Sequence, residues 1–252
     1  MMNVVAAEIR KLTTVRTTWV LTLAGIALVG FNVGLFVFSN LTGDFTGADE
    51  QWANLIGQVT GNSAFALVVA IMLVTTEFRH GTIGRTLQLV PSRTKVMLSK
   101  LTAGGFYGAV FFVVALPVMF IIGIIGGGFD IGANSFDALW QGLIATVLTA
   151  IFGIAIGALI RSQVVALVVS LVWLFIVEPL ATVFLPSVGR WLPFQLVSDL
   201  FTPEEMSEAM AAAEGAPMMA DPVAAPLGIT VFFGYVALAT VGAGLLLRYR
   251  DV

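Results

Sequence analysis

The sequence predicts an all-α, polytopic membrane protein with six transmembrane helices, and two observations carry this prediction. The first is composition: 58% of the 252 residues are hydrophobic and 11% are charged, whereas a soluble domain has about 25% charged residues. Lipid is therefore expected to cover much of the surface. The second is a set of apolar runs that reach or approach the roughly 20 residues needed to cross a bilayer. The runs are 19–38, 55–76, 98–125, 138–160, 164–185 and 227–247.

The basic residues predict which side of the membrane each loop faces. Eleven of the twelve lie on one set of alternating loops, and only Arg190 lies on the other. The eleven are Arg10, Lys11, Arg16, Arg79, Arg85, Arg93, Lys95, Lys100, Arg161, Arg248 and Arg250. Because basic residues mark the cytoplasmic side, both termini are expected to be cytoplasmic, in a multi-pass protein of the cell membrane. The basic side suits anionic membrane lipid, and no nucleic-acid partner is expected.

The N-terminal residues 1–18 precede the first run and have their own pattern. Val5, Ile9, Leu12 and Arg16 share one helical face, whereas Glu8 and Lys11 lie off it. This predicts a short interfacial helix on the inner leaflet; the alternative is a frayed basic tail. The first run is longer than the ~7–15 apolar residues of a cleaved signal peptide, so it is expected to be a retained helix.

Polar and small residues inside the runs predict contacts between helices. Run two begins with the polar residues Gln58, Thr60, Asn62 and Ser63, which are expected to face other helices or a cavity because lipid cannot satisfy them. Two Gly pairs with i, i+4 spacing, in runs three and four, predict close helix packing, although glycine is frequent in all membrane helices. The pairs are Gly104 with Gly108 and Gly153 with Gly157. Pro117 predicts a kink in run three.

The segment after run five is interrupted by turn-forming residues. Glu178-Pro179 lies inside the run, and Pro186 and Pro193 follow it. This pattern predicts a broken or re-entrant hairpin at the outer face, within an extracellular segment 186–226. The acidic part of that segment predicts one short helix at 203–213.

Several kinds of chemistry are not expected in this chain, which forms a single membrane domain over 1–252. It has no G-x-x-x-x-G-K-[ST] phosphate loop, so ATP binding by that route is excluded. One histidine, His80, and no cysteine make a metal site improbable. No catalytic residue and no cofactor are expected.

The inner loop 77–97 contains the most specific motif. It reads E-F-R-H-G-T-I-G-R-T, then P-S-R at 91–93 and K-x-x-x-x-K at 95–100. This pattern, together with the six-helix layout, resembles the permease subunits of ABC-2-type transporters. Without the resemblance, the loop would be an ordinary basic loop.

The resemblance implies a partner and a mechanism. Loop 77–97 would be the coupling helix that docks on a separate ATP-binding subunit, and Glu178 would match an acidic residue of the fifth helix. The residues to which the resemblance assigns partner binding are Glu77, Arg79, Gly81, Arg85, Leu87 and Arg93. A second permease copy would complete the transporter, as a homodimer by default or as a related permease. Rigid-body movement of the helices would then export a hydrophobic or amphiphilic substrate.

Two other functions stay open at this point. Glu178 is either a structural residue of the outer hairpin or an intramembrane ionisable site. In the second case the chain would be a stand-alone secondary transporter, although its sequence shows no convincing internal repeat. An intramembrane enzyme has no residue pattern in its favour.

Overall fold

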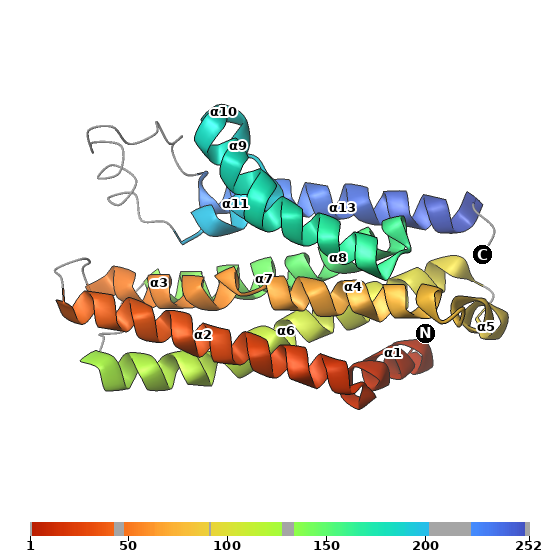
Figure 1. Ribbon diagram of the computed structural model, residues 1–252, viewed down its shortest axis with the longest axis horizontal. Coiled ribbons are helices and arrows are strands. Elements are labelled where there is room, and N and C mark those ends of the chain that lie inside the picture. The colour runs from red at the N-terminus through yellow and green to blue at the C-terminus, as the bar shows by residue number, and fades with distance from the viewer. Residues whose placement is uncertain (1, 43–47, 91, 128–133, 202–222, 250–252) are drawn as a thin grey trace.

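The protein is a bundle of long helices that run side by side (Figure 1). The computed structural model describes residues 2–42, 48–90, 92–127, 134–201 and 223–249, and it has no strand in these ranges. Six helical segments there are long and apolar enough to cross a membrane, which confirms the predicted number. The six are Arg16–Ser39, Trp52–Arg79, Arg93–Gly126, Phe136–Ile160, Gln163–Phe184 and Ala225–Leu247.

The six spans are built from helices of very different lengths. Four spans are single helices, namely α2 (Arg16–Thr42), α6 (Arg93–Gly127), α7 (Asn134–Ile160) and α13 (Ala225–Tyr249). The second span joins α3 (Ala48–Gly61) to α4 (Ala64–Arg79), and the fifth joins α8 (Gln163–Val172), the π-helical turn η1 (Trp173–Val177) and α9 (Glu178–Phe184). Helix α6 continues through Pro117.

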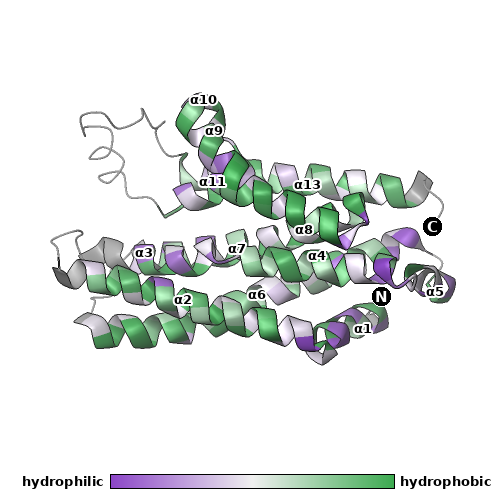
Figure 2. Cartoon of the chain, viewed as in Figure 1, coloured by the Kyte–Doolittle hydropathy of each residue, from purple (hydrophilic) through white to green (hydrophobic). Residues whose placement is uncertain are grey.

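Helix α7 lies at the centre of the bundle and packs against α3, α4, α6 and α13. Two glycines explain how closely its neighbours approach. A Cβ added to Gly153 would lie 2.6 Å from the carbonyl oxygen of Leu67 in α4, and one added to Gly108 of α6 would lie 2.8 Å from that of Thr146. These distances confirm the predicted close packing. The outward faces of the other helices are mostly hydrophobic (Figure 2), as expected of surfaces in contact with lipid.

The second span breaks at Asn62 and Ser63, between α3 and α4. Both side chains are buried, and the Asn62 amide donates to the carbonyl of Gln58 at 2.7 Å and accepts from Asn32 at 3.4 Å. Thr60 is also buried and donates to the carbonyl of Ile56. Three of the four polar residues of run two are therefore buried in the bundle, as predicted, whereas Gln58 is half-buried.

The chain after the fifth span folds into a compact turn of short helices. After α9, the chain turns through α10 (Pro186–Gly189) and returns as α11 (Pro193–Asp199), which packs against α13 and α3. The broken or re-entrant hairpin at the outer face stays a prediction. The expected helix at 203–213 lies outside the described residues.

One end of the bundle collects the basic residues, and we call it the inner end. It contains α1 (Met2–Thr14), the short helix α5 (Ile83–Leu89), the beginning of α6 and the end of α13 (Figure 1). Leu12 of α1 is buried against the bundle, whereas Val5 and Ile9 are half-buried. Glu8 lies off that apolar stripe, yet it is only 1% exposed. The face of α1 that packs on the bundle is therefore wider than the sequence pattern indicated.

Candidate functional site at the inner end

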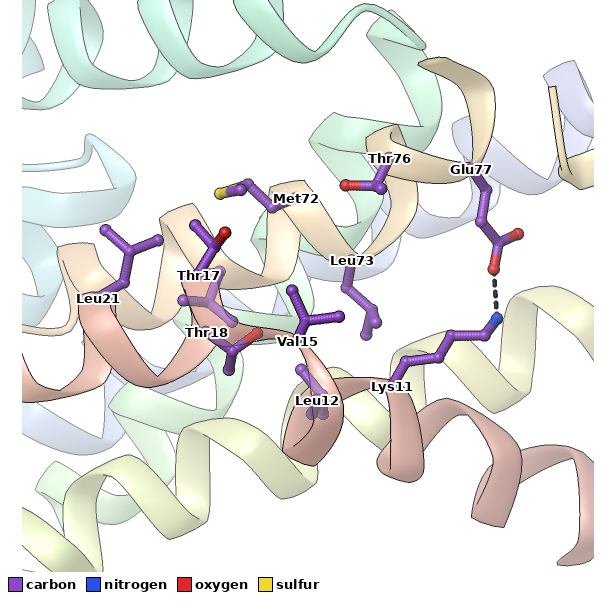
Figure 3. A pocket seen from close by; sticks show the side chains of 11 residues that line it. Lys11, Leu12, Val15, Thr17, Thr18, Leu21, Met72, Leu73, Thr76 and Glu77 are labelled. Atoms are coloured by element: carbon purple, nitrogen blue, oxygen red, sulfur yellow. Dashed lines mark hydrogen bonds and ion pairs between the residues drawn. The ribbon is translucent and has the colours of Figure 1, made fainter. Parts of the chain in front are cut away.

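Four charged side chains from three helices meet at the inner end. Lys100 of α6 places its Nζ 2.7 Å from Oε1 of Glu77, at the end of α4, and 3.1 Å from Oε1 of Glu8 in α1. Lys11 of α1 places its Nζ 2.5 Å and 2.9 Å from the same two oxygens; its contact with Glu77 is drawn in Figure 3. We call these four residues the charge cluster. The cluster joins α1 to the ends of the second and third spans.

Burial makes the charge cluster sensitive to the loss of any member. Glu8, Glu77 and Lys100 are 1%, 6% and 2% exposed, and the two carboxylates balance the two ammonium groups. A buried charge is costly unless it is paired. Each carboxylate keeps one oxygen, Oε2, that is buried and has no hydrogen-bond partner among the described residues. The contacts between the two Oε1 atoms and the lysine ammonium groups therefore offset most of the cost of burying these carboxylates.

Lys11 is the most accessible member of the charge cluster. Its side chain is 40% exposed. Burial lowers its pKa, but the hydrogen bonds to Glu77 and Glu8 outweigh that effect and raise the pKa above its ordinary value. Lys11 is therefore positively charged at neutral pH, as the balance of the cluster requires.

The turn that follows Glu77 positions α5. The backbone N–H of Thr82 donates to the carbonyl of Glu77 at 2.9 Å. Gly81 has a φ of 64°, which a residue with a side chain rarely adopts. This turn brings Ile83 into a buried position while Arg85 and Leu89 face outward, Leu89 with 85% exposure. The short helix is thus fixed at its first residue and exposed along its outer face.

The remaining residues predicted in the loop are spread over the inner end. Arg79 is exposed and donates to the side chain of Gln163, the first residue of α8, at 3.3 Å. Arg93 is half-buried and donates to the carbonyl of Leu247 in α13. Leu87 lies in α5, but its side chain is outside the described residues. The six predicted residues therefore share one end of the bundle without forming one continuous surface.

Two arginines bind the last turn of α13. Arg161, between α7 and α8, donates to the carbonyl of Leu246 at 2.9 Å, next to the Leu247 carbonyl that Arg93 binds. The last four carbonyls of a helix have no partner within it, and positive charge at that end is favourable. Arg161 adopts a φ of 60° to make this contact. The end of the sixth span is thus tied to both inner loops.

Glu178 lies away from the inner end, in a pocket beside Thr60 and Ser63 at the break of the second span, and is 3% exposed. Its carboxylate accepts hydrogen bonds from the indole N–H of Trp173 at 2.6 Å and from the backbone N–H groups of Phe194 and Gln195 at 3.0 and 2.9 Å. The last two belong to the first turn of α11, where a carboxylate is favourable. This geometry supports the structural role for Glu178.

Sequence reasoning did not assign a role to Glu8, Lys11 or Lys100. A signal was nevertheless present, because only three acidic residues fall on the predicted inner side and two of them are Glu8 and Glu77. Isolated carboxylates among many basic residues indicate pairing. No group of His, Cys, Asp and Glu side chains that could hold a metal ion occurs in the described part of the chain.

Comparison with known proteins gives one match. A family model described as "ABC-2 family transporter protein" matches residues 4–177, a range that includes the charge cluster, α5 and the first five spans up to η1. No curated protein matches the chain.

Proposed function

We propose, from the premise that this chain belongs to the ABC-2 transporter family and is a multi-pass protein of the cell membrane, that it is the permease subunit of an ATP-driven exporter. A separate ATP-binding subunit would hydrolyse ATP, because the chain has no phosphate loop. The substrate would be hydrophobic or amphiphilic, because the helices of this chain present mostly apolar surfaces.

The observation that carries the proposal is the connection of α5 to the charge cluster. The turn after Glu77 leads directly into α5, while the Glu77 carboxylate contacts Lys100 of α6 and Lys11 of α1. A force applied to the exposed face of α5 would therefore reach three helices at once. Coupled movement of this kind is what rigid-body switching requires.

A second copy of the permease is part of the proposal. The fifth span has only 17% of its apolar window buried within one chain. Its exposed side chains include Val164, Val168, Val172 and Phe175, which recur at helical spacing. A homodimer through this face is the default, with a related permease as the alternative.

The hydrogen bonds of Glu178 favour the permease over the secondary-transporter alternative. An ion-coupling carboxylate has to exchange its partners during transport, whereas Glu178 is held by one indole and two backbone N–H groups of a helix end. Transport into liposomes that contain the chain alone would restore that alternative, because a secondary transporter needs no ATP-binding partner.

The experiment that tests the proposal is co-purification from solubilised native membranes, followed by identification of bound proteins and an ATPase assay. The double variant Arg85→Glu and Leu89→Glu reverses a charge and adds another on the exposed face of α5. It is expected to lose the ATP-binding subunit while retaining its fold. The control variant Arg10→Glu changes an exposed arginine of α1 and should retain the partner. Normal binding by the double variant would refute the role of α5.

A further inference from the structure

A groove lies between α6 and α13 in the inner half of the bundle. Both helices pack closely against α7 but contact each other little, which leaves a hollow of about 640 Å³ between them. Leu98 and Leu101 of α6 form one wall, and Val241, Gly244 and Leu245 of α13 form the other. The absence of a side chain at Gly244 widens the groove, because a Cβ there would meet no atom within 4 Å.

The groove opens toward the lipid. Its wall residues belong to the third and sixth spans, and Leu98, Val241 and Leu245 are 43%, 60% and 48% exposed. From Arg93 to Leu101 the wall extends for about 12 Å at the 1.5 Å rise of a helix. Apolar walls at this depth favour a hydrocarbon chain, since a polar ligand would leave its own groups unsatisfied.

The inner end of the groove is basic. The guanidinium of Arg93 lines it and is held toward α13 by the Leu247 carbonyl. Thr94, the next residue of α6, also lines the groove and is exposed. Arginine binds phosphate oxygens through a planar set of N–H donors, and basic pockets between cytoplasmic helix ends bind anionic headgroups.

We propose that this groove binds one anionic phospholipid of the inner leaflet. An acyl chain lies between α6 and α13, beside Gly244, and the phosphate lies at Arg93, next to Thr94. The lipid thereby fills the gap that α7 leaves between the two helices and stabilises their inner ends. This site is separate from α5, so its existence does not depend on the ATP-binding partner.

The substitution Gly244→Leu tests the proposal because it places a side chain in the groove without a clash. Gly234→Leu is the matched control: it lies on the same helix, outside the groove, and its Cβ also meets no atom within 4 Å. Native mass spectrometry of protein in mild detergent measures bound phospholipid. Titration with phosphatidylglycerol or phosphatidylcholine, followed by thermal unfolding, measures affinity and headgroup preference.

The wild type and Gly234→Leu are expected to retain about one anionic phospholipid per chain and to be stabilised more by phosphatidylglycerol than by phosphatidylcholine. Gly244→Leu is expected to bind phosphatidylglycerol at least about tenfold more weakly, equivalent to about 1.4 kcal/mol. Arg93→Gln should reduce the headgroup preference while leaving a chain in the groove, whereas Lys95→Gln, at a position on another side of α6, should not.

Three results would overturn the proposal. The first is equal phospholipid retention by Gly244→Leu and Gly234→Leu. The second is equal stabilisation of the wild type by both lipids, which would remove the role of the basic end. The third is a change in oligomeric state for Gly244→Leu alone, which would assign the groove to a second copy of the chain.

Discussion

The ammonium group of Lys100 lies 2.7 Å from Oε1 of Glu77, although both side chains are almost fully buried and 23 residues separate them. This contact joins the end of the second span to the beginning of the third, across the loop that contains α5. Glu8 and Lys11 add the N-terminal helix to the same contact. The inner end is thus held together by charge pairing as well as by apolar packing.

Replacement of Lys100 by Met should strongly destabilise the protein. The substitution leaves two buried carboxylates opposite one ammonium group, and breaking a buried ion pair costs about 3–5 kcal/mol. Thermal unfolding in detergent measures the effect. The control Lys95→Met removes an exposed lysine of the same helix and should change stability by less than about 0.5 kcal/mol.

A second substitution distinguishes charge imbalance from lost packing. In the Lys100→Met background, Glu8→Gln removes the one excess negative charge and should recover part of the lost stability. If the double variant is no more stable than Lys100→Met, the loss comes from packing and the charge cluster does not act as described.

The contribution of Lys11 should disappear at alkaline pH. Its pKa is raised in the folded protein above the ordinary 10.5, so its stabilising effect is complete below that value and is lost as the pH rises through the folded pKa. The stability difference between wild type and Lys11→Gln should therefore be constant from neutral pH to about pH 9.5 and shrink above pH 10.5. A difference that decreases already below pH 9 would contradict this assignment.

Replacement of Glu178 by Gln should loosen the outer hairpin. The amide nitrogen of glutamine would face a backbone donor of α11 and leave it without an acceptor, which costs about 1–3 kcal/mol. Hydrogen exchange at Phe194 and Gln195 should become faster. Asp137→Asn is the control, since Asp137 also accepts from an indole N–H but is exposed, and exchange in α11 should remain unchanged.

Gly153→Ala and Gly34→Ala should have opposite effects. A Cβ on Gly153 would lie 2.6 Å from the backbone oxygen of Leu67, so α7 would have to move away from α4 at a cost of about 1–3 kcal/mol. A Cβ on Gly34 meets nothing within 4 Å, and alanine there should stabilise α2 by up to about 1 kcal/mol. The free energy of unfolding of each variant, compared with that of the wild type, shows whether the two stability changes have opposite signs.

The number of spans could be predicted from the sequence because hydrophobic length is a local property. The packing glycines Gly108 and Gly153 were also recognisable, since the i, i+4 spacing of small residues is visible in one helix. The buried polar start of run two, with Asn62, followed from the same reasoning about unsatisfied groups.

The charge cluster could not be predicted in the same way. Glu8 and Lys100 are 92 residues apart, and their contact depends on how α1 packs against α6. The pattern of α1 favoured the stripe through Leu12 and placed Glu8 outside it, because an apolar periodicity does not reveal a charge that is buried with a partner. The donors to Glu178 were hidden for a similar reason, since α11 is a short helix in a segment rich in turn residues.

The π-helical turn Trp173–Val177 sets the direction in which the outer hairpin leaves the fifth helix. Such a turn holds one residue more than regular α-helix, and each residue of an α-helix rotates the chain by about 100°. Deleting a single residue from this stretch would restore a regular helix and swing the Glu178 carboxylate to another side of it. The contact between the fifth helix and α11 therefore depends on a single extra residue in the helix.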